Sequence, residues 1–459
     1  MRWHIGSLPM MGSDVLSDGE NTAWAERLLA VASALLAISI LYLWFRAFYF
    51  RASPNSVISF AGSDPPYLPG GQARRAILGV HYFGDFQIEY AYGHLLGTGR
   101  SPYIGSYIHD DQSPLSALSF YVFSLVSITR SALVYFALTV GGMLTPLWFL
   151  LRPWRTSQRI VFLSVLGILS LGSIATLDRG NDIGITFSLI AFCCLAWKLQ
   201  RWWLCGAMLA LAIAFKGYPA ALLIVPLGLR RYRFAILVGA TAIVLNFSAL
   251  LFFPGGLFEN LKRLMPALTS LNLHNGTELL SWNIYSLVPK AVGLVAGAGV
   301  SSGLKQPDSK ILWAFSALYL LGVWLIIARR RVPQWCWGPL ALASVQVVVP
   351  LSYSYSTIWS VLGCVWFAKG ELFKVADPQM AHRRTAVLRA SVLLTLVVTT
   401  VPSALELVGV HGFETPLTAF LSPLFLTCTF GIAVFDSFQG SLVSDGVDER
   451  TPTDVALGA

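Results

Sequence analysis

The stretch FAILVGATAIVLNFSALLFFP, residues Phe234–Pro254, contains no charged side chain. An apolar run of about 20 residues is long enough to cross the hydrocarbon core of a bilayer as a helix. Similar blocks recur along the 459-residue chain, in which 55% of the residues are hydrophobic and 12% are charged. A soluble protein carries about 25% charged residues. The composition therefore excludes a soluble globular enzyme and a disordered chain, and it predicts an all-α, polytopic membrane protein.

The net charge of +9 comes largely from short clusters of cations between the apolar blocks. Loops rich in Lys and Arg face the cytoplasm, so these clusters indicate topology and no nucleic-acid partner is expected. The clusters are Arg152–Arg159, Lys198–Arg201, Arg230–Arg233, Arg329–Arg331 and Arg383–Arg389.

Placing these clusters on the cytoplasmic side makes the segments between them hairpins. The outer turns are then LDRGNDIG (177–184), AFKGYP (214–219) and LSYSYS (351–356). Two longer segments, 51–113 and 255–309, fall on the same outer face. Residues 114–152 hold two apolar blocks separated at Thr129–Ser131. This stretch leads from the outer segment 51–113 to the cytoplasmic cluster Arg152–Arg159, so it must cross the membrane an odd number of times. One block is therefore re-entrant, or the stretch is a single broken helix.

The domain organisation follows from this topology. Residues 1–22 are predicted to be a cytoplasmic segment, 23–436 a transmembrane domain of about 12 spans, and 437–459 a disordered cytoplasmic tail. The block Ala23–Phe50 is too long for a signal peptide and is expected to remain as the first span. The six cysteines lie within or beside apolar blocks and are interpreted as inert packing residues.

The outer loop 51–113 contains a helix-like pattern that begins at GDFQIEY, residues 84–90. Asp85 stands at the predicted helix start, where an acid is often a cap. Glu89 follows one turn later on the same face. We expect this helix to lie along the membrane surface and to end near Gly97. Its apolar face is predicted to hold Phe86, Ile88, Tyr90, Ala91, Leu95 and Leu96.

Several short motifs in this order resemble glycosyltransferase family 87. They are Asp-Phe-x-x-x-Tyr (85–90), Leu-Leu-x-x-Gly-x-Ser-Pro-Tyr (95–103), Pro114-Leu115, DRGND (178–182), FKGYP (215–219) and the Asn- and His-containing loop 271–287. The resemblance covers about residues 25–370. DRGND differs from the Gly-Gln-x-Asn that the family often has there, which leaves the identity of the sugar open.

The resemblance implies a GT-C-like bundle with its active site on the extracytoplasmic side of the cell membrane, in bacteria the plasma membrane. The family includes mannosyltransferases that use polyprenyl-phosphate sugars. The expected partners are a polyprenyl-phosphate sugar donor, a glycolipid or polysaccharide acceptor such as a lipoglycan, and membrane lipids. The expected reaction moves a hexose, with mannose the first candidate, to that acceptor.

Such a reaction needs a general base for the acceptor hydroxyl and positive charge for the departing phosphate. The resemblance assigns the base to Asp85, with a helix cap or a solvated acid as the alternative. Glu89 is the second candidate for the base, or a hydrogen-bond partner of the acceptor sugar. The pair Asp110-Asp111 is interpreted as a solvated pair beside a span, with a divalent-cation site as the alternative, although two adjacent acids are a weak metal signal. No nucleotide site, cofactor or metal is expected, since a lipid phosphate leaves readily and the outer loops lack an Asp-x-Asp pair.

The phosphate contacts are predicted at Lys216, Arg179 and His274. Lys216 follows an apolar run, where a charge must be paired or reach the interface. Arg179 carries a fork suited to phosphate but could instead pair with Asp178 or Asp182, and a lone loop histidine such as His274 is often an ordinary surface residue. Sugar contacts are predicted at Asn181 and Tyr353.

A lipid or solute transporter is the main alternative. A transporter is expected to hold ionisable residues in the middle of its helices, whereas most acids here lie near the ends of apolar blocks or in loops. An arabinofuranosyl or glucosyl transferase, or a non-catalytic homologue, also stays open. A single well-placed carboxylate favours inversion at the anomeric carbon.

Overall fold

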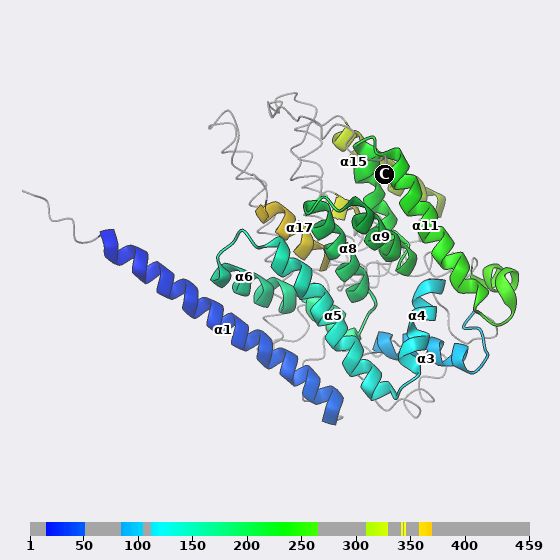
Figure 1. Cartoon of the computed structure of the whole chain (residues 1–459), viewed down its shortest axis with the longest axis horizontal. Coiled ribbons are helices and arrows are strands. Elements are labelled where there is room, and N and C mark those ends of the chain that lie inside the picture. Colours follow the sequence, from blue (N-terminus) through cyan, green and yellow to red (C-terminus); the bar gives the residue numbers. More distant parts are fainter. Residues whose placement is uncertain are drawn as a thin grey trace, which may run out of the picture.

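The computed structural model describes residues 15–50, 84–103, 112–264, 309–328, 341–342, 344–345 and 358–369. Within these ranges every regular element is a helix and no strand occurs, which confirms the all-helical class. Figure 1 shows the arrangement of the helices. They are α1 (Val15–Phe50), α3 (Gly84–Gly97), α4 (Pro114–Ser124), α5 (Ile128–Leu150), α6 (Thr156–Phe162), the π-helix η2 (Leu163–Ile168), α7 (Leu171–Arg179), α8 (Ile183–Lys198), α9 (Trp202–Phe215), the 3₁₀ helix η3 (Tyr218–Leu223), α10 (Ile224–Gly228), α11 (Tyr232–Leu251), α15 (Ser309–Ala328) and α17 (Ile358–Lys369).

Three helical segments of the described chain are long and apolar enough to cross a membrane. They are Ala23–Tyr42 within α1, Ile128–Leu150 (α5) and Tyr232–Leu251 (α11). Large apolar side chains on these helices, such as Leu138 on α5 and Ile236 on α11, point outward with more than half of their surface exposed. Lipid tails are the environment that suits such faces. The total of about 12 spans and the domain boundaries stay predictions.

The stretch after Gln112 divides into a short helix and a long one. Pro114 opens α4, and the Ser113 hydroxyl accepts from the backbone N–H of Ser116 as an N-cap. The 11 residues of α4 rise only about 16 Å, which is too short for a hydrocarbon core of about 30 Å. Of the two helices only α5 qualifies as a span, which fits the odd number of crossings.

The position of the break differs from the prediction. It falls at residues 125–127, and Thr129–Ser131 lie in the first turn of α5. The physical reason is local, because the Ser131 hydroxyl donates to the backbone carbonyl of Phe123 and holds the end of α4 beside the start of α5. Ser131 can therefore bond to the end of the neighbouring helix while remaining within its own.

Two predicted hairpins are present as expected. Helices α7 and α8 are joined by the turn Gly180–Asp182, and α9 ends at Phe215, just before Lys216. Helices α8 and α9 pack side by side, and α8 also packs on α5. The two turns are therefore held at fixed positions on the bundle.

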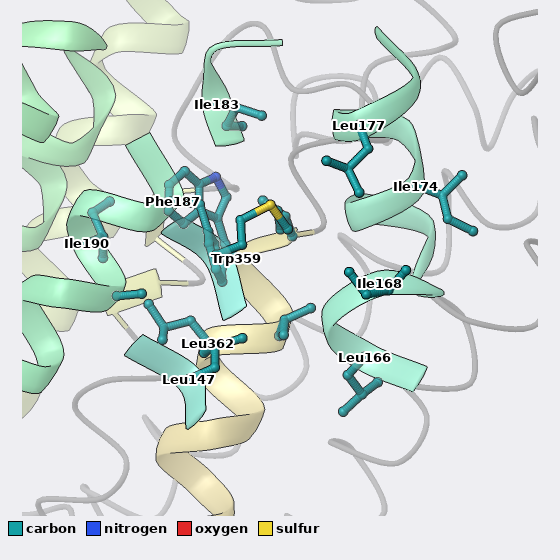
Figure 2. Packing of buried hydrophobic residues seen from close by; sticks show 14 of the residues in the cluster. Leu147, Leu166, Ile168, Ile174, Leu177, Ile183, Phe187, Ile190, Trp359 and Leu362 are labelled. Carbon is teal, nitrogen blue, oxygen red and sulfur yellow. The ribbon is translucent and has the colours of Figure 1, made fainter. Parts of the chain in front are cut away.

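A shared core fixes the turn between α7 and α8. Figure 2 shows Phe187 of α8 and Trp359 of α17 packed together, with Leu147 of α5 and Leu362 of α17 close by. The rings of Phe187 and Trp359 lie 5.9 Å apart between centroids. Leu177, near the end of α7, belongs to the same core. Because the cluster joins α5, α7, α8 and α17, it gives the turn a rigid base.

Helix α3 covers Gln112 and α4, and its buried face differs from the one expected. Phe86, Glu89 and Tyr92 are each no more than 1% exposed, so an acid lies in the middle of the buried face. The reason is the close crossing with α4 at Gly93. A Cβ atom added there would lie 2.2 Å from the backbone oxygen of Phe120, so only glycine permits this approach. The crossing brings the Glu89 face of α3 into the bundle.

Candidate active site

Five polar side chains from three separate segments form one group, which we call the acidic cluster. It consists of Asp85 and Glu89 on α3, Asn181 and Asp182 on the turn after α7, and Lys216 after α9. The carboxyl groups of Asp85 and Asp182 and the ammonium of Lys216 all act electrostatically on Glu89. Residues from the 51–113 segment and from the turns 177–184 and 214–219 are therefore joined at one place.

The turn after α7 presents Asn181 to Asp85. Gly180 adopts a left-handed conformation with φ 62° and ends α7, which glycine does at little cost. The Asn181 side-chain oxygen then accepts from the backbone N–H of Ile183 at 2.9 Å. This bond leaves the amide N–H₂ group facing α3, where it donates to Asp85 Oδ2 at 2.6 Å. Asn181 is 5% exposed, so the donor is held in place.

Asp182 and Lys216 form a buried ion pair. Lys216 Nζ lies 2.8 Å from Asp182 Oδ1, and the two side chains are 12% and 0% exposed. The Ser116 hydroxyl of α4 donates to the second carboxylate oxygen at 3.1 Å. Lys216 is at the point where α9 gives way to extended backbone, with φ −138° and ψ 123°. The Ser113 hydroxyl donates to the carbonyl of Phe215 at 2.8 Å, which fixes this chain end against α4.

Glu89 is the most deeply buried acid on α3, at 1% exposure. Gln112 Nε2 donates to its Oε1 at 3.1 Å, and the Tyr103 hydroxyl donates to the backbone oxygen of Gln112 at 2.9 Å. Burial raises the pKa of Glu89 well above its ordinary value of 4.5, and the negative charges of Asp182 and Asp85 raise it further. Lys216 and, more weakly, the backbone N–H of Asp182 act in the opposite direction.

The three acids of the cluster differ in access to the surroundings. Glu89 and Asp182 are buried, whereas Asp85 is partly exposed. Asp85 accepts a hydrogen bond from the held Asn181 amide. Asp85 is thus the acid of the cluster that combines partial exposure with a fixed hydrogen-bond donor.

The sequence-predicted residues fall into two groups. The structure brings Asp85, Glu89, Asn181 and Lys216 together. Arg179 is the last residue of α7, and its side chain lies outside the description, as do His274, Tyr353 and the Asp110-Asp111 pair. The roles given to these residues stay predictions.

Sequence reasoning gave no site role to Asp182, Gln112 or Ser116. Asp182 was visible as the last residue of DRGND, beside Asn181, but was considered only as an ion-pair partner of Arg179. The structure pairs it with Lys216. Gln112 and Ser116 lie on either side of the Ser-Pro start of α4. The available signal in the sequence was a polar residue, Gln112, just before the N-cap Ser113.

Among the residues that the structure covers, no three His, Cys, Asp or Glu side chains come together in a way that could hold a metal ion. The prediction that the protein uses no metal concerns the whole chain and stays a prediction. Cys193 and Cys205 are free thiols whose sulfur atoms lie 3.2 Å apart between α8 and α9.

Comparison with known proteins gives one family. The family model of glycosyltransferase family 87 matches residues 113–354, more than half of the chain. The matched region contains Asn181, Asp182 and Lys216, while Asp85 and Glu89 lie just before it. No curated protein matches the chain.

Proposed function

The chain belongs to glycosyltransferase family 87 and is a membrane glycosyltransferase, and on that premise we propose that the acidic cluster is its catalytic centre. The proposed donor is a polyprenyl-phosphate hexose, with mannose the first candidate, and the acceptor is a glycolipid or lipoglycan at the extracytoplasmic face. The hydrogen bond between Asn181 and the partly exposed Asp85 is the observation that carries this proposal.

Asp85 is the proposed general base. The acceptor hydroxyl attacks the anomeric carbon and gives its proton to the Asp85 carboxylate, while the bond from that carbon to the phosphate oxygen breaks. The phosphate leaves with the bonding electrons. A single displacement inverts the anomeric centre, by analogy with enzymes that hydrolyse glycosides in one step. Asn181 holds the carboxylate in place and, in our proposal, also contacts sugar hydroxyls, as Tyr353 does.

Lys216 is the proposed contact for the donor phosphate within the cluster. An ammonium group carries three N–H donors, so Lys216 can bind Asp182 and a phosphate oxygen together. Its 12% exposure and position at a chain turn suit a partly buried charge that stabilises a leaving anion. Arg179 and His274 complete the proposed phosphate contacts.

The test uses the full-length protein in lipid vesicles with polyprenyl-phosphate mannose labelled in the sugar and a glycolipid extract as acceptor. We expect the label to appear in the glycolipid fraction, with the anomeric configuration inverted in the product by NMR. Label that crosses the bilayer still attached to the donor identifies a transporter and contradicts the proposal. Transfer from an arabinofuranosyl or glucosyl donor in place of mannose keeps the centre and changes the sugar.

A further inference from the structure

Several cations gather at the end of the bundle that lies away from the acidic cluster. Helix α8 begins next to Asp182 and ends at Lys198, and its 16 residues rise about 24 Å. The end of α5, the turn from α8 to α9 and the start of α11 lie together there. They carry four cations, which we call the basic patch: Arg152, Lys198, Arg201 and Arg231.

The ends of α5 and α8 hold the first two of these cations close together. Lys198 Nζ donates to the carbonyl oxygen of Leu150, the last residue of α5, at 3.3 Å, as cations at helix ends often do. Arg152 follows two residues later, is exposed, and lies close enough to act on Lys198 electrostatically. The bond to Leu150 therefore fixes one cation beside another of the same sign.

The other two cations precede the starts of α9 and α11. Arg201 and Arg231 are exposed and stand just before these helices, where the helix dipole disfavours a cation and favours an anion. The guanidinium of Arg231 lies over the Trp202 ring, 4.0 Å from its centroid. The Trp202 ring lies 4.9 Å from that of Trp197, between centroids, and Trp197 precedes Lys198. Stacked rings thus connect the two halves of the patch.

No acid of the neighbouring helices compensates the basic patch. The acids of residues 112–264 are Asp178, Asp182 and Glu259, which belong to the end of α7, the turn after it and the segment that follows α11. Within the part of the chain that the structure describes, none of the four cations makes an ion pair, whereas the nearby Arg155 is paired with Glu26. Cations held this close favour an anion from outside the chain.

The surroundings of the basic patch favour a lipid as the source of that anion. Helix α11 starts at the patch and carries outward-facing apolar side chains, among them Ile236 and Leu237, which are 67% and 66% exposed. Trp203, beside the Trp202 ring in sequence, is 73% exposed, and tryptophan is typical of the depth at which lipid headgroups lie. A phospholipid at this place would lay its acyl chains along α11 while its phosphate meets the cations.

We propose that the basic patch binds the headgroup of an anionic phospholipid from the leaflet at this end of the bundle, which is the cytoplasmic leaflet in the predicted topology. The guanidinium groups of Arg201 and Arg231 donate to the phosphate, for which their fork is suited, and Lys198 and Arg152 add positive charge around it. The bound lipid offsets the repulsion among the four cations. This site lies apart from the acidic cluster and does not depend on the proposed function.

The test measures lipid affinity of the full-length protein in detergent by native mass spectrometry, with phosphatidylglycerol and phosphatidylcholine of the same acyl chains. Wild type binds phosphatidylglycerol more tightly. The double variant Arg201→Gln/Arg231→Gln binds it about 25-fold more weakly, at about fivefold for each cation, with phosphatidylcholine affinity unchanged. The matched control Arg130→Gln/Lys262→Gln removes as much charge from exposed positions at the other end of the bundle and keeps the affinity. Equal affinity of wild type for both lipids, or an equal loss in the control, overturns the proposal.

Salt and competing anions test the site in the wild-type protein, so the result stands even if the double variant does not fold. The affinity for phosphatidylglycerol falls as salt rises from about 0.1 to about 1 M, because the Debye length shortens from about 10 to about 3 Å. An affinity that salt leaves unchanged overturns the proposal. At fixed ionic strength, inorganic phosphate and an acidic peptide leave the lipid bound. Displacement of phosphatidylglycerol by either one assigns the patch to a soluble anion or to a protein partner and overturns the proposal.

Discussion

Asn181 donates a hydrogen bond of 2.6 Å to Asp85, which lies 96 positions earlier in the chain. The bond joins the first turn of α3 to the turn that follows α7. The side-chain oxygen of Asn181 accepts a hydrogen bond from the backbone N–H of Ile183 at 2.9 Å. Asp85 thus meets its substrate, in our proposal, with one oxygen already oriented by a fixed donor.

We expect Asn181→Ala to lower kcat by about tenfold or more, which is less than the full contribution of about 10²–10⁴ that a positioned base makes. The donor that orients Asp85 is lost, while the acid itself remains. Asn260→Ala is the matched control, since Asn260 is a buried asparagine with three hydrogen bonds outside the cluster, to Ser101, Pro254 and Gly256. Steady-state transfer assays compare the two variants after their unfolding temperatures are measured. Equal loss of activity in both would assign the effect of Asn181 to the fold.

The buried pair Asp182–Lys216 predicts a large effect on stability. Removing one partner leaves an uncompensated buried charge, so Lys216→Met or Asp182→Asn should each cost about 3–5 kcal/mol. The double variant should lose less than the sum of the two, because the partners are in contact. Denaturant unfolding in detergent measures the free energy of unfolding of the two single variants and of the double variant.

The exposed pair Arg155–Glu26 provides the control for that experiment. Its atoms lie 3.6 Å apart, and its side chains are 74% and 40% exposed. Arg155→Ala should change the free energy of unfolding by less than about 1 kcal/mol. Additive effects of Lys216→Met and Asp182→Asn would show that the two residues do not form a pair in the membrane protein.

The close crossing of α3 and α4 is tested by Gly93→Ala. The new methyl group would lie 2.2 Å from the Phe120 backbone oxygen, and overpacking of this kind costs about 1–3 kcal/mol. Because α3 must move, transfer should fall as well. Gly141→Ala on α5 is the control, since nothing lies within 4 Å of the added atom, and it should raise stability by up to about 1 kcal/mol. A Gly93→Ala protein as stable and active as wild type would contradict the crossing.

The raised pKa of Glu89 also predicts how stability depends on pH. The folded protein binds this proton more tightly than the unfolded chain, whose glutamate has the ordinary pKa of 4.5. The resulting stabilisation is complete below that value and is lost as the pH rises through the folded pKa. Between pH 5 and 9, the unfolding temperature should therefore fall more steeply for wild type than for Glu89→Gln. Parallel curves would show that Glu89 titrates alike in both states.

Part of this site could be predicted from the sequence. The hairpin turns carried Asn181 and Lys216 to one face, and the motif around Asp85 placed a helix start beside them. These signals are local, because turn residues and apolar blocks are read directly along the chain. The structure adds the contacts that join them.

The rest depended on packing that periodicity does not record. Glu89 was placed on the polar side of its helix, since nothing in α3 alone shows that α4 closes over it at Gly93. In the same way, Asp182 was an adjacent partner for Arg179 in the sequence, whereas the fold places Lys216 at 2.8 Å. The partner of a buried charge is set by the crossing of helices, and two distant turns meet only in three dimensions.

Transfer of labelled sugar by Asp85→Asn, measured beside donor binding in the same vesicles, tests the central claim most directly. The account predicts that transfer falls by about 10²-fold or more while the donor binds as in wild type. The control Glu259→Gln, which changes an acid in an exposed pair with Arg263, should remain fully active. Wild-type turnover by Asp85→Asn would contradict it.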